Sequence, residues 1–131
     1  MILRLSAKLA KKLRETPTQS LPLDPNPFAD WSAHLFTAGR TQHILITNTA
    51  SLYSVVMHGK GITDATVFLR QALNCIRETL QEEGQEFLFE RLIAPYIDRV
   101  LISKALNRQV TGSMNELARK THKKRLSGVV M

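Results

Sequence analysis

The sequence predicts an α+β domain: a small, mostly antiparallel sheet of about four strands with helices packed on one face. Two observations carry this prediction. Apolar runs rich in β-branched residues occur at 43–47 and 52–57, and an apolar stripe at helical spacing runs over 64–83. The 131 residues, 44% of them hydrophobic, suit one domain with a buried core. We expect that domain to span 1–126 and expect a disordered tail at 127–131.

The N-terminal segment carries a strand signal followed by a helix signal. Residues 1–6 are expected to form a strand. Ser6 can then cap a short helix over 7–15, because its hydroxyl can accept a hydrogen bond from the first helical turn. A single amphipathic helix over 2–14 is the alternative, and it would resemble a basic helix on a membrane surface.

A proline-rich stretch separates this segment from the next helix signal. Four of the five prolines fall within 16–27, where they remove backbone donors and hold their neighbours out of helical geometry, so we expect an extended loop. Asn26 and Pro27 then mark a helix start. The expected helix ends at Gly39, and its core side chains at helical spacing are Phe28, Trp31 and Leu35.

The rest of the chain completes the expected fold. The strands at 43–47 and 52–57 are separated by a short turn, which predicts an antiparallel hairpin. Thr63 or Asp64 can start the long helix, which is expected to run to about Glu83, and Gly84 is placed to stop it. The later elements are expected in this order: a helix over 86–94, a strand over 99–105 and a capped helix from Ser113.

Positive charge is concentrated at the two ends of the sequence. Residues 1–14 carry five bases and no acid, and residues 119–125 carry five more, in a chain of net charge +7. If these ends meet in space, they form one positive patch, which is the electrostatic footprint of a protein that binds a polyanion. Nucleic acid, held through its phosphates, is the expected polyanion. A solvated helix end that aids solubility is the alternative for the C-terminal bases.

The candidate binding residues form two groups. A polar cluster between the last expected strand and the last expected helix can hold a phosphate or carboxylate on free helix N–H groups, or it is simply a well-capped turn. That cluster consists of Asn107, Arg108, Ser113 and Asn115. The second group is the basic tail, with Lys120, Lys123, Lys124 and Arg125.

Two histidines are candidates for catalysis. His43 and His58 fall near the outer ends of the two hairpin strands, so they can be cross-strand neighbours. Such a pair can serve acid–base cleavage of RNA, with Lys60 or Arg40 at the phosphate. The histidines lack zinc-site spacing and the lone Cys75 is expected to be a small buried residue. We therefore expect no metal and no cofactor.

The sequence favours a non-enzymatic binding module in the cytoplasm. No apolar run is long enough to cross a bilayer, and Arg4 and Lys8 interrupt the N-terminal apolar stretch, so we expect neither a membrane partner nor a secretory signal. One alternative is a small metal-independent ribonuclease or toxin-like enzyme. The other is a scaffold or protein-interaction domain that binds a protein partner or forms a homo-oligomer through its hairpin edge.

Several residues and one motif of the sequence occur together in a recognisable pattern. They are Asp30, Trp31, Asn48, the run 52–54 and an Asn-Arg-x-Val-x-Gly-Ser-Met-Asn motif at 107–115. In this pattern the chain resembles a family of small bacterial domains of unknown function. The resemblance covers about 1–118, and this motif is its most specific part. Gln109 and Thr111 depart from the family pattern. The resemblance implies no activity.

Overall fold

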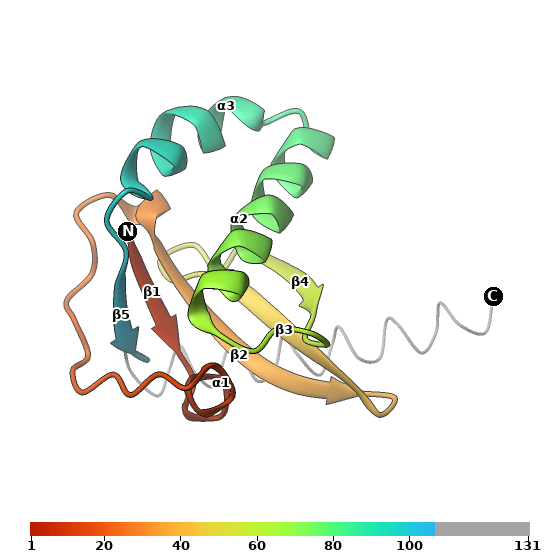
Figure 1. Cartoon of the computed structure of the whole chain (residues 1–131). Coiled ribbons are helices and arrows are strands. Elements are labelled where there is room, and N and C mark those ends of the chain that lie inside the picture. The colour runs from red at the N-terminus through yellow and green to blue at the C-terminus, as the bar shows by residue number, and fades with distance from the viewer. Residues whose placement is uncertain (107–131) are drawn as a thin grey trace.

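The structure is a computed structural model that describes residues 1–106, and its fold is α+β as expected (Figure 1). Five strands form one sheet in the order β4-β3-β2-β1-β5. They are β1 (Ile2–Leu5), β2 (Asp30–Ala38), β3 (Thr41–Asn48), β4 (Ser54–His58) and β5 (Leu101–Lys104). The helices are α1 (Ala7–Leu13), α2 (Ala65–Glu82) and α3 (Glu86–Leu88), and α3 continues as a π-helical turn over Phe89–Ile93 and a 3-10 turn over Ala94–Tyr96.

The prediction of a mostly antiparallel sheet of about four strands was partly wrong. The antiparallel part is the meander β2-β3-β4. β1 lies beside it and pairs in parallel with both β2 and β5. Parallel neighbours need a long connection, and the chain supplies one between β1 and β2. β5 reaches the other side of β1 only after the meander and the helices α2 and α3. The extra strand comes from a segment that the sequence pattern assigned to a helix.

That segment is the expected helix up to Gly39, which is a strand instead. Asn26 does cap, since its side chain accepts a hydrogen bond from the Phe28 N–H, but it caps only a 3-10 turn over Pro27–Ala29. β2 then pairs along its length with β3, and its first residues also pair with β1. Gly39 (φ +58°) and Arg40 (φ +69°) form the β2–β3 turn, where two left-handed residues suit the twist of a tight hairpin.

The other described elements follow the sequence pattern more closely. The strand at the N-terminus and the helix after it are confirmed, and the single helix over 2–14 is wrong. The Ser6 hydroxyl accepts a hydrogen bond from the Leu9 N–H (3.3 Å), and the Asp64 carboxylate accepts one from the Val67 N–H (2.9 Å). β4 begins two residues later than expected, because Leu52 adopts a left-handed backbone (φ +64°) in the turn. The expected helix at Ser113 and the expected tail at 127–131 lie outside the described residues.

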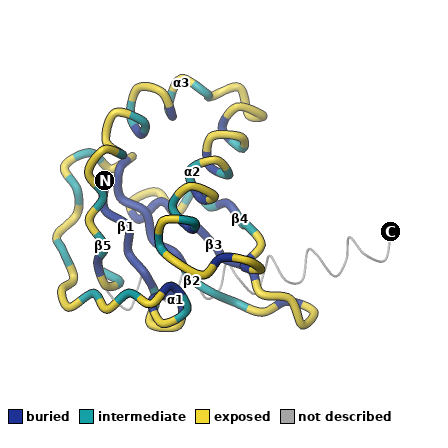
Figure 2. The backbone as a smooth tube through the Cα atoms, in the orientation of Figure 1, coloured by how far each residue is buried: buried dark blue, intermediate teal, exposed yellow. Residues whose placement is uncertain are grey.

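The apolar core lies between one face of the sheet and the helices. α2 packs across this face with an apolar stripe at helical spacing, as predicted, formed by Phe68, Ala72, Ile76 and Leu80. Figure 2 shows the resulting dark, buried strands beneath the helices. Alternation along the strands directs one set of side chains into this core: Leu3, Leu5, Trp31, Ala33, Ile44 and Ile46.

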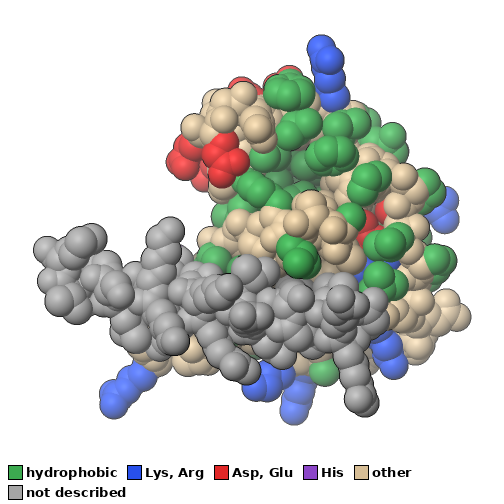
Figure 3. Space-filling model, turned by 180° about the vertical axis from the view of Figure 1, so that it is seen from behind, with side chains coloured by type: hydrophobic (Ala, Val, Ile, Leu, Met, Phe, Trp, Pro, Cys, Tyr) green, Lys and Arg blue, Asp and Glu red, His purple; other side chains and the backbone are tan. Residues whose placement is uncertain are grey.

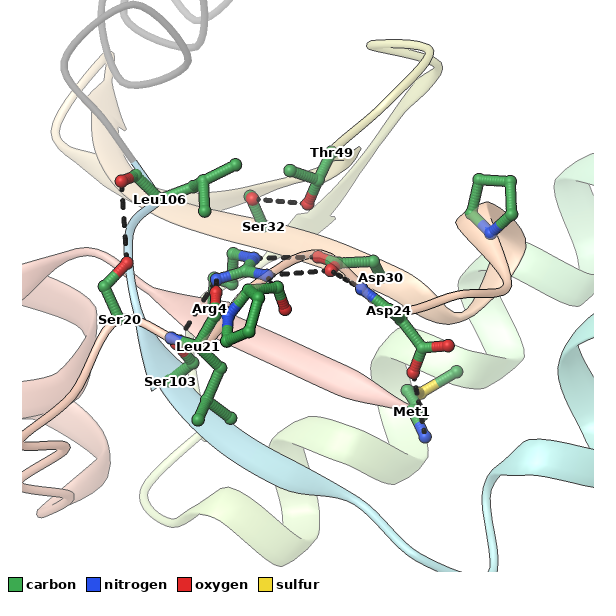
Figure 4. Close-up of polar contacts among 12 residues, drawn as sticks. Met1, Arg4, Ser20, Leu21, Asp24, Asp30, Ser32, Thr49, Ser103 and Leu106 are labelled. Atoms are coloured by element: carbon green, nitrogen blue, oxygen red, sulfur yellow. Dashed lines mark hydrogen bonds and ion pairs between the residues drawn. The ribbon is translucent and has the colours of Figure 1, made fainter.

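A buried ion pair on the opposite face of the sheet holds the proline-rich loop (Figure 4). Arg4 and Asp30 are fully buried and joined by two hydrogen bonds of 2.8 Å. The guanidinium also donates to the carbonyl oxygens of Leu21 (2.6 Å) and Pro22 (3.1 Å) and to the Ser103 hydroxyl (3.3 Å). Arg4, which the sequence counts among the basic N-terminal residues, therefore adds nothing to a surface patch.

This environment sets the acid response of Asp30. Burial alone raises the pKa of the Asp30 carboxyl, but hydrogen bonds from Arg4 and from the Asp24 N–H, together with the Arg4 charge, hold it below its ordinary value of 3.8. Because the pKa of Asp30 is lower in the folded state than in the unfolded state, its ionised carboxylate stabilises the fold at pH values above the unfolded-state pKa. The stabilisation is lost as the pH falls from about 3.8 through the folded-state pKa.

We expect a carboxyl NMR titration to give Asp30 an apparent pKa below 3.8 in the folded protein. Urea unfolding at descending pH should show a loss of stability that is smaller in the Asp30→Asn variant, because that variant has no carboxyl to protonate at this position. A folded-state pKa of Asp30 at or above 3.8 contradicts the expectation.

Candidate polyanion-binding end of the sheet

One end of the sheet brings together segments that are far apart in the sequence. β1 and β5 end side by side there, with Leu5 paired to Lys104. β2 runs parallel to β1 and also ends there, so the turn into β3 lies at the same end. β4 ends opposite the start of β3, where His58 pairs with His43. α1, the β2–β3 turn, the β4–α2 loop and the end of β5 therefore surround one end of the sheet (Figure 1).

These four segments carry a set of cations that we call the basic end: Lys8, Lys11, Lys12, Arg14, Arg40, Lys60 and Lys104. All are exposed except Lys12, which is half-buried. The Lys12 ammonium donates a 2.8 Å hydrogen bond to the Gln42 side chain and thereby joins α1 to the hairpin. Seen from behind, several Lys and Arg side chains lie along the lower edge of the molecule, others project at the top and the right, and a group of acidic side chains lies at the upper left (Figure 3).

The local sequence explains why α1 presents its charges outward. Leu9, Ala10 and Leu13 are buried on its inner side. Its lysines occupy the other positions, and Lys11 and Lys12 in the last turn favour the negative end of the helix dipole. The helix is therefore held by apolar contacts and a cap, which leaves the exposed Lys8 and Lys11 available to meet a ligand.

The basic end is also concave. A cavity of about 660 Å³ lies between α1, the start of the proline-rich loop and the end of β5. Lys11 on α1 and Lys104 at the end of β5 both line this cavity. Glu15 also lines it, and apolar residues form much of the remaining wall. A phosphate at this cavity can contact cations from two elements at once.

Two histidines lie beside this surface, on the neighbouring strands β3 and β4. His43 and His58 are cross-strand neighbours, as predicted, with ring centroids 5.1 Å apart. His43 is buried and stacks on Phe36, whereas His58 is exposed. Burial, with a smaller contribution from the Lys8 charge, lowers the pKa of His34 on β2. Catalysis by His43 and His58 stays a prediction.

The other predicted site residues lie outside the described residues. They are Asn107, Arg108, Ser113, Asn115, Lys120, Lys123, Lys124 and Arg125. Sequence reasoning placed Arg40 and Lys60 beside the histidines and missed Lys104. The signal for Lys104 was its position at the end of a strand, but only the parallel pairing of β5 with β1 brings it to α1.

Three further features of the described chain concern metal ligands, membrane-spanning helices and the cysteine. Within residues 1–106 no three His, Cys, Asp or Glu side chains are grouped as a metal site. The described helices include none with the length and hydropathy to cross a membrane. Cys75 is half-buried, and its thiol lies 3.6 Å from the Val56 carbonyl oxygen. Burial is the main cause that raises the pKa of this thiol.

Comparison with known proteins gives one match. Residues 2–125 match the model of a family described as a domain of unknown function (DUF6933). No curated protein and no solved structure shows significant similarity to the chain. The bacterial origin and the motif at 107–115 stay predictions.

Proposed function

The chain belongs to the DUF6933 family, whose function is unknown, and we propose that it is a non-enzymatic module that binds a polyanion at its basic end. The observation that carries this proposal is the convergence of cations from α1, the β2–β3 turn, the β4–α2 loop and β5 on one end of the sheet. Nucleic acid is the polyanion we favour, because its phosphates repeat along an extended strand, as these cations do along the sheet end.

The expected mode of contact is electrostatic. The basic end holds its positive charge on long side chains and includes no aromatic side chain on α1, so the phosphates and not the bases are its targets. Glu82, Glu83 and Glu86 lie at the far end of α2, so the charge distribution is uneven and helps to orient the molecule as it approaches a polyanion. The basic tail, with Lys120, Lys123, Lys124 and Arg125, would extend the same contact along the ligand.

Neutralising the basic end is expected to weaken nucleic-acid binding at least tenfold at about 100 mM salt, measured by fluorescence anisotropy of labelled RNA and DNA. The variant carries Lys8→Gln, Lys11→Gln and Arg14→Gln, all at exposed positions. Lys8 and Lys11 lie in α1, where glutamine keeps helix propensity, and Arg14 is the residue that ends the helix. Each lost duplex phosphate contact should also reduce the slope of log K against log salt by about 0.9.

The matched control removes the same charge elsewhere. Its substitutions are Arg77→Gln, Arg91→Gln and Arg99→Gln, all exposed and all outside the basic end. We expect the control to change the affinity about twofold or less, since distant surface charges are screened. Equal losses in the two variants, or no binding by the parent chain, would exclude the basic end as the binding surface.

A further inference from the structure

A small cavity with aromatic walls lies at the other end of the sheet. Its volume is about 150 Å³, and it is bounded by the start of β2, the β3–β4 turn, the end of α2 and α3. A cavity of this size can hold a benzene-sized group. Its main walls are Phe28, Trp31, Tyr53, Leu80, Leu88 and Ile93. The Trp31 and Tyr53 rings pack edge to face at 81°, with centroids 6.5 Å apart, and both line the cavity.

Hydrogen bonds fix these walls in place. The Trp31 indole N–H donates to the Phe28 carbonyl oxygen (2.8 Å), and the Tyr53 hydroxyl donates to the Glu83 carboxylate (3.2 Å). Asn48 holds the two loops at the floor, since its amide donates to the Pro27 carbonyl oxygen (2.8 Å) and its carbonyl accepts from the Ser51 N–H (3.0 Å). The cavity is therefore preformed and needs little ordering to receive a ligand.

The surroundings of the cavity are negative. α2 ends here, and the carbonyl end of a helix carries a partial negative charge. α2 has no basic residue in its last turn. Three acidic residues, Glu82, Glu83 and Glu86, lie instead at the junction between α2 and α3. Burial, followed by the charge and the hydrogen bond of Glu83, raises the pKa of Tyr53 to about 12.

We propose that this cavity binds a small organic cation, an ammonium group that carries apolar substituents. Aromatic rings attract such cations over their faces, and apolar substituents gain from leaving water. Glu83 at the Tyr53 hydroxyl supplies the opposite charge. The negative surroundings disfavour an anion, and a strongly hydrated metal ion gains little from walls of this composition. The site differs from the basic end in position, sign of charge and ligand.

The single tryptophan of the chain makes this proposal testable. Because Trp31 lines the cavity, its fluorescence reports occupancy without a label. We expect choline to produce a saturable change in Trp31 emission that sodium chloride at equal ionic strength does not produce. We expect 3,3-dimethyl-1-butanol, its neutral counterpart of similar shape, to bind at least fivefold more weakly, a ratio on the order of a cation–π contribution.

Two variants distinguish the effect of the Glu83 charge on choline binding from the effect of the Tyr53 ring. Glu83→Gln is expected to weaken choline binding about threefold to tenfold and to leave the neutral alcohol unchanged. Tyr53→Phe keeps the ring and removes the hydroxyl, so it should retain most of the choline affinity. Glu78→Gln on the exposed surface of α2 is the matched control and should bind as the parent chain does.

Two results would overturn the proposal that the cavity binds an organic cation. Equal affinity for choline and the neutral alcohol would reduce the site to an apolar cavity and overturn the proposal. Absence of a saturable response to choline in a chain that unfolds cooperatively in urea would overturn it as well. The basic-end variant Lys8→Gln, Lys11→Gln, Arg14→Gln should bind choline normally, so failure of the polyanion proposal and failure of this one are distinguishable.

Discussion

Replacement of Arg4 by methionine is expected to lower the free energy of unfolding by about 3–5 kcal/mol. The Arg4 side chain is fully buried and donates to both Asp30 carboxylate oxygens, two loop carbonyl oxygens and the Ser103 hydroxyl. Methionine fills similar volume and offers no donor. The variant therefore leaves a buried carboxylate without its cation and two carbonyl oxygens without their donor.

Urea unfolding followed by circular dichroism measures this loss. The double variant Arg4→Met, Asp30→Leu should recover part of it, because it removes the buried charge that the single variant leaves behind. Arg99→Met on the exposed surface is the control and should lie within about 0.5 kcal/mol of the parent chain. A loss below about 1 kcal/mol for Arg4→Met would mean that Asp30 finds another partner or a proton at little cost.

Replacement of Leu9 by alanine is expected to lower the free energy of unfolding by about 2–5 kcal/mol. Leu9 is fully buried, and with Ala10 and Leu13 it forms the apolar side on which α1 rests. α1 has only 7 residues, which is too short for a helix to persist in water without packing. The lost side chain therefore weakens both the core and the attachment of the helix that carries Lys8 and Lys11.

Two measurements check this expectation. Urea unfolding gives the loss of stability, with the exposed Lys11→Ala as a control that should change it by less than about 0.5 kcal/mol. Amide hydrogen exchange in the folded variant should show faster exchange in α1 than in α2, because α1 loses its main anchor. Unchanged protection of α1 would show that Leu13 and the Ser6 cap suffice to hold it.

The sequence predicted the correct helix or strand where the spacing of apolar residues fits only one kind of secondary structure. In α2 the capping Asp64, the stripe from Phe68 to Leu80 and Gly84 (φ +73°) agree with one another, and the helix forms where they predict it. The β3–β4 hairpin was equally readable, because two apolar runs flank a short turn. For the candidate site, the sequence supplied the basic character of the N-terminal helix and the pairing of His43 with His58.

The segment from Phe28 to Gly39 shows where a local pattern fails. Trp31 and Leu35 are four residues apart, which suits a helix, but Trp31, Ala33 and Leu35 also alternate, which suits a strand. Pairing with β1 and β3 satisfies the backbone groups of this segment on both sides, and that long-range gain decides between the two periods. The spacing of residues within the segment therefore cannot by itself distinguish a helix from a strand.

The sequence by itself determined the α+β class, the caps of two helices and the charge of the N-terminal segment, because each depends on residues within a turn or two of one another. Only the tertiary structure decided that Arg4 is buried against Asp30, that β1 lies between two parallel partners, and that Lys104 and Arg40 join α1 at one end of the sheet. These outcomes depend on which strand pairs with which, and strand order is set by the packing of the whole chain around one core.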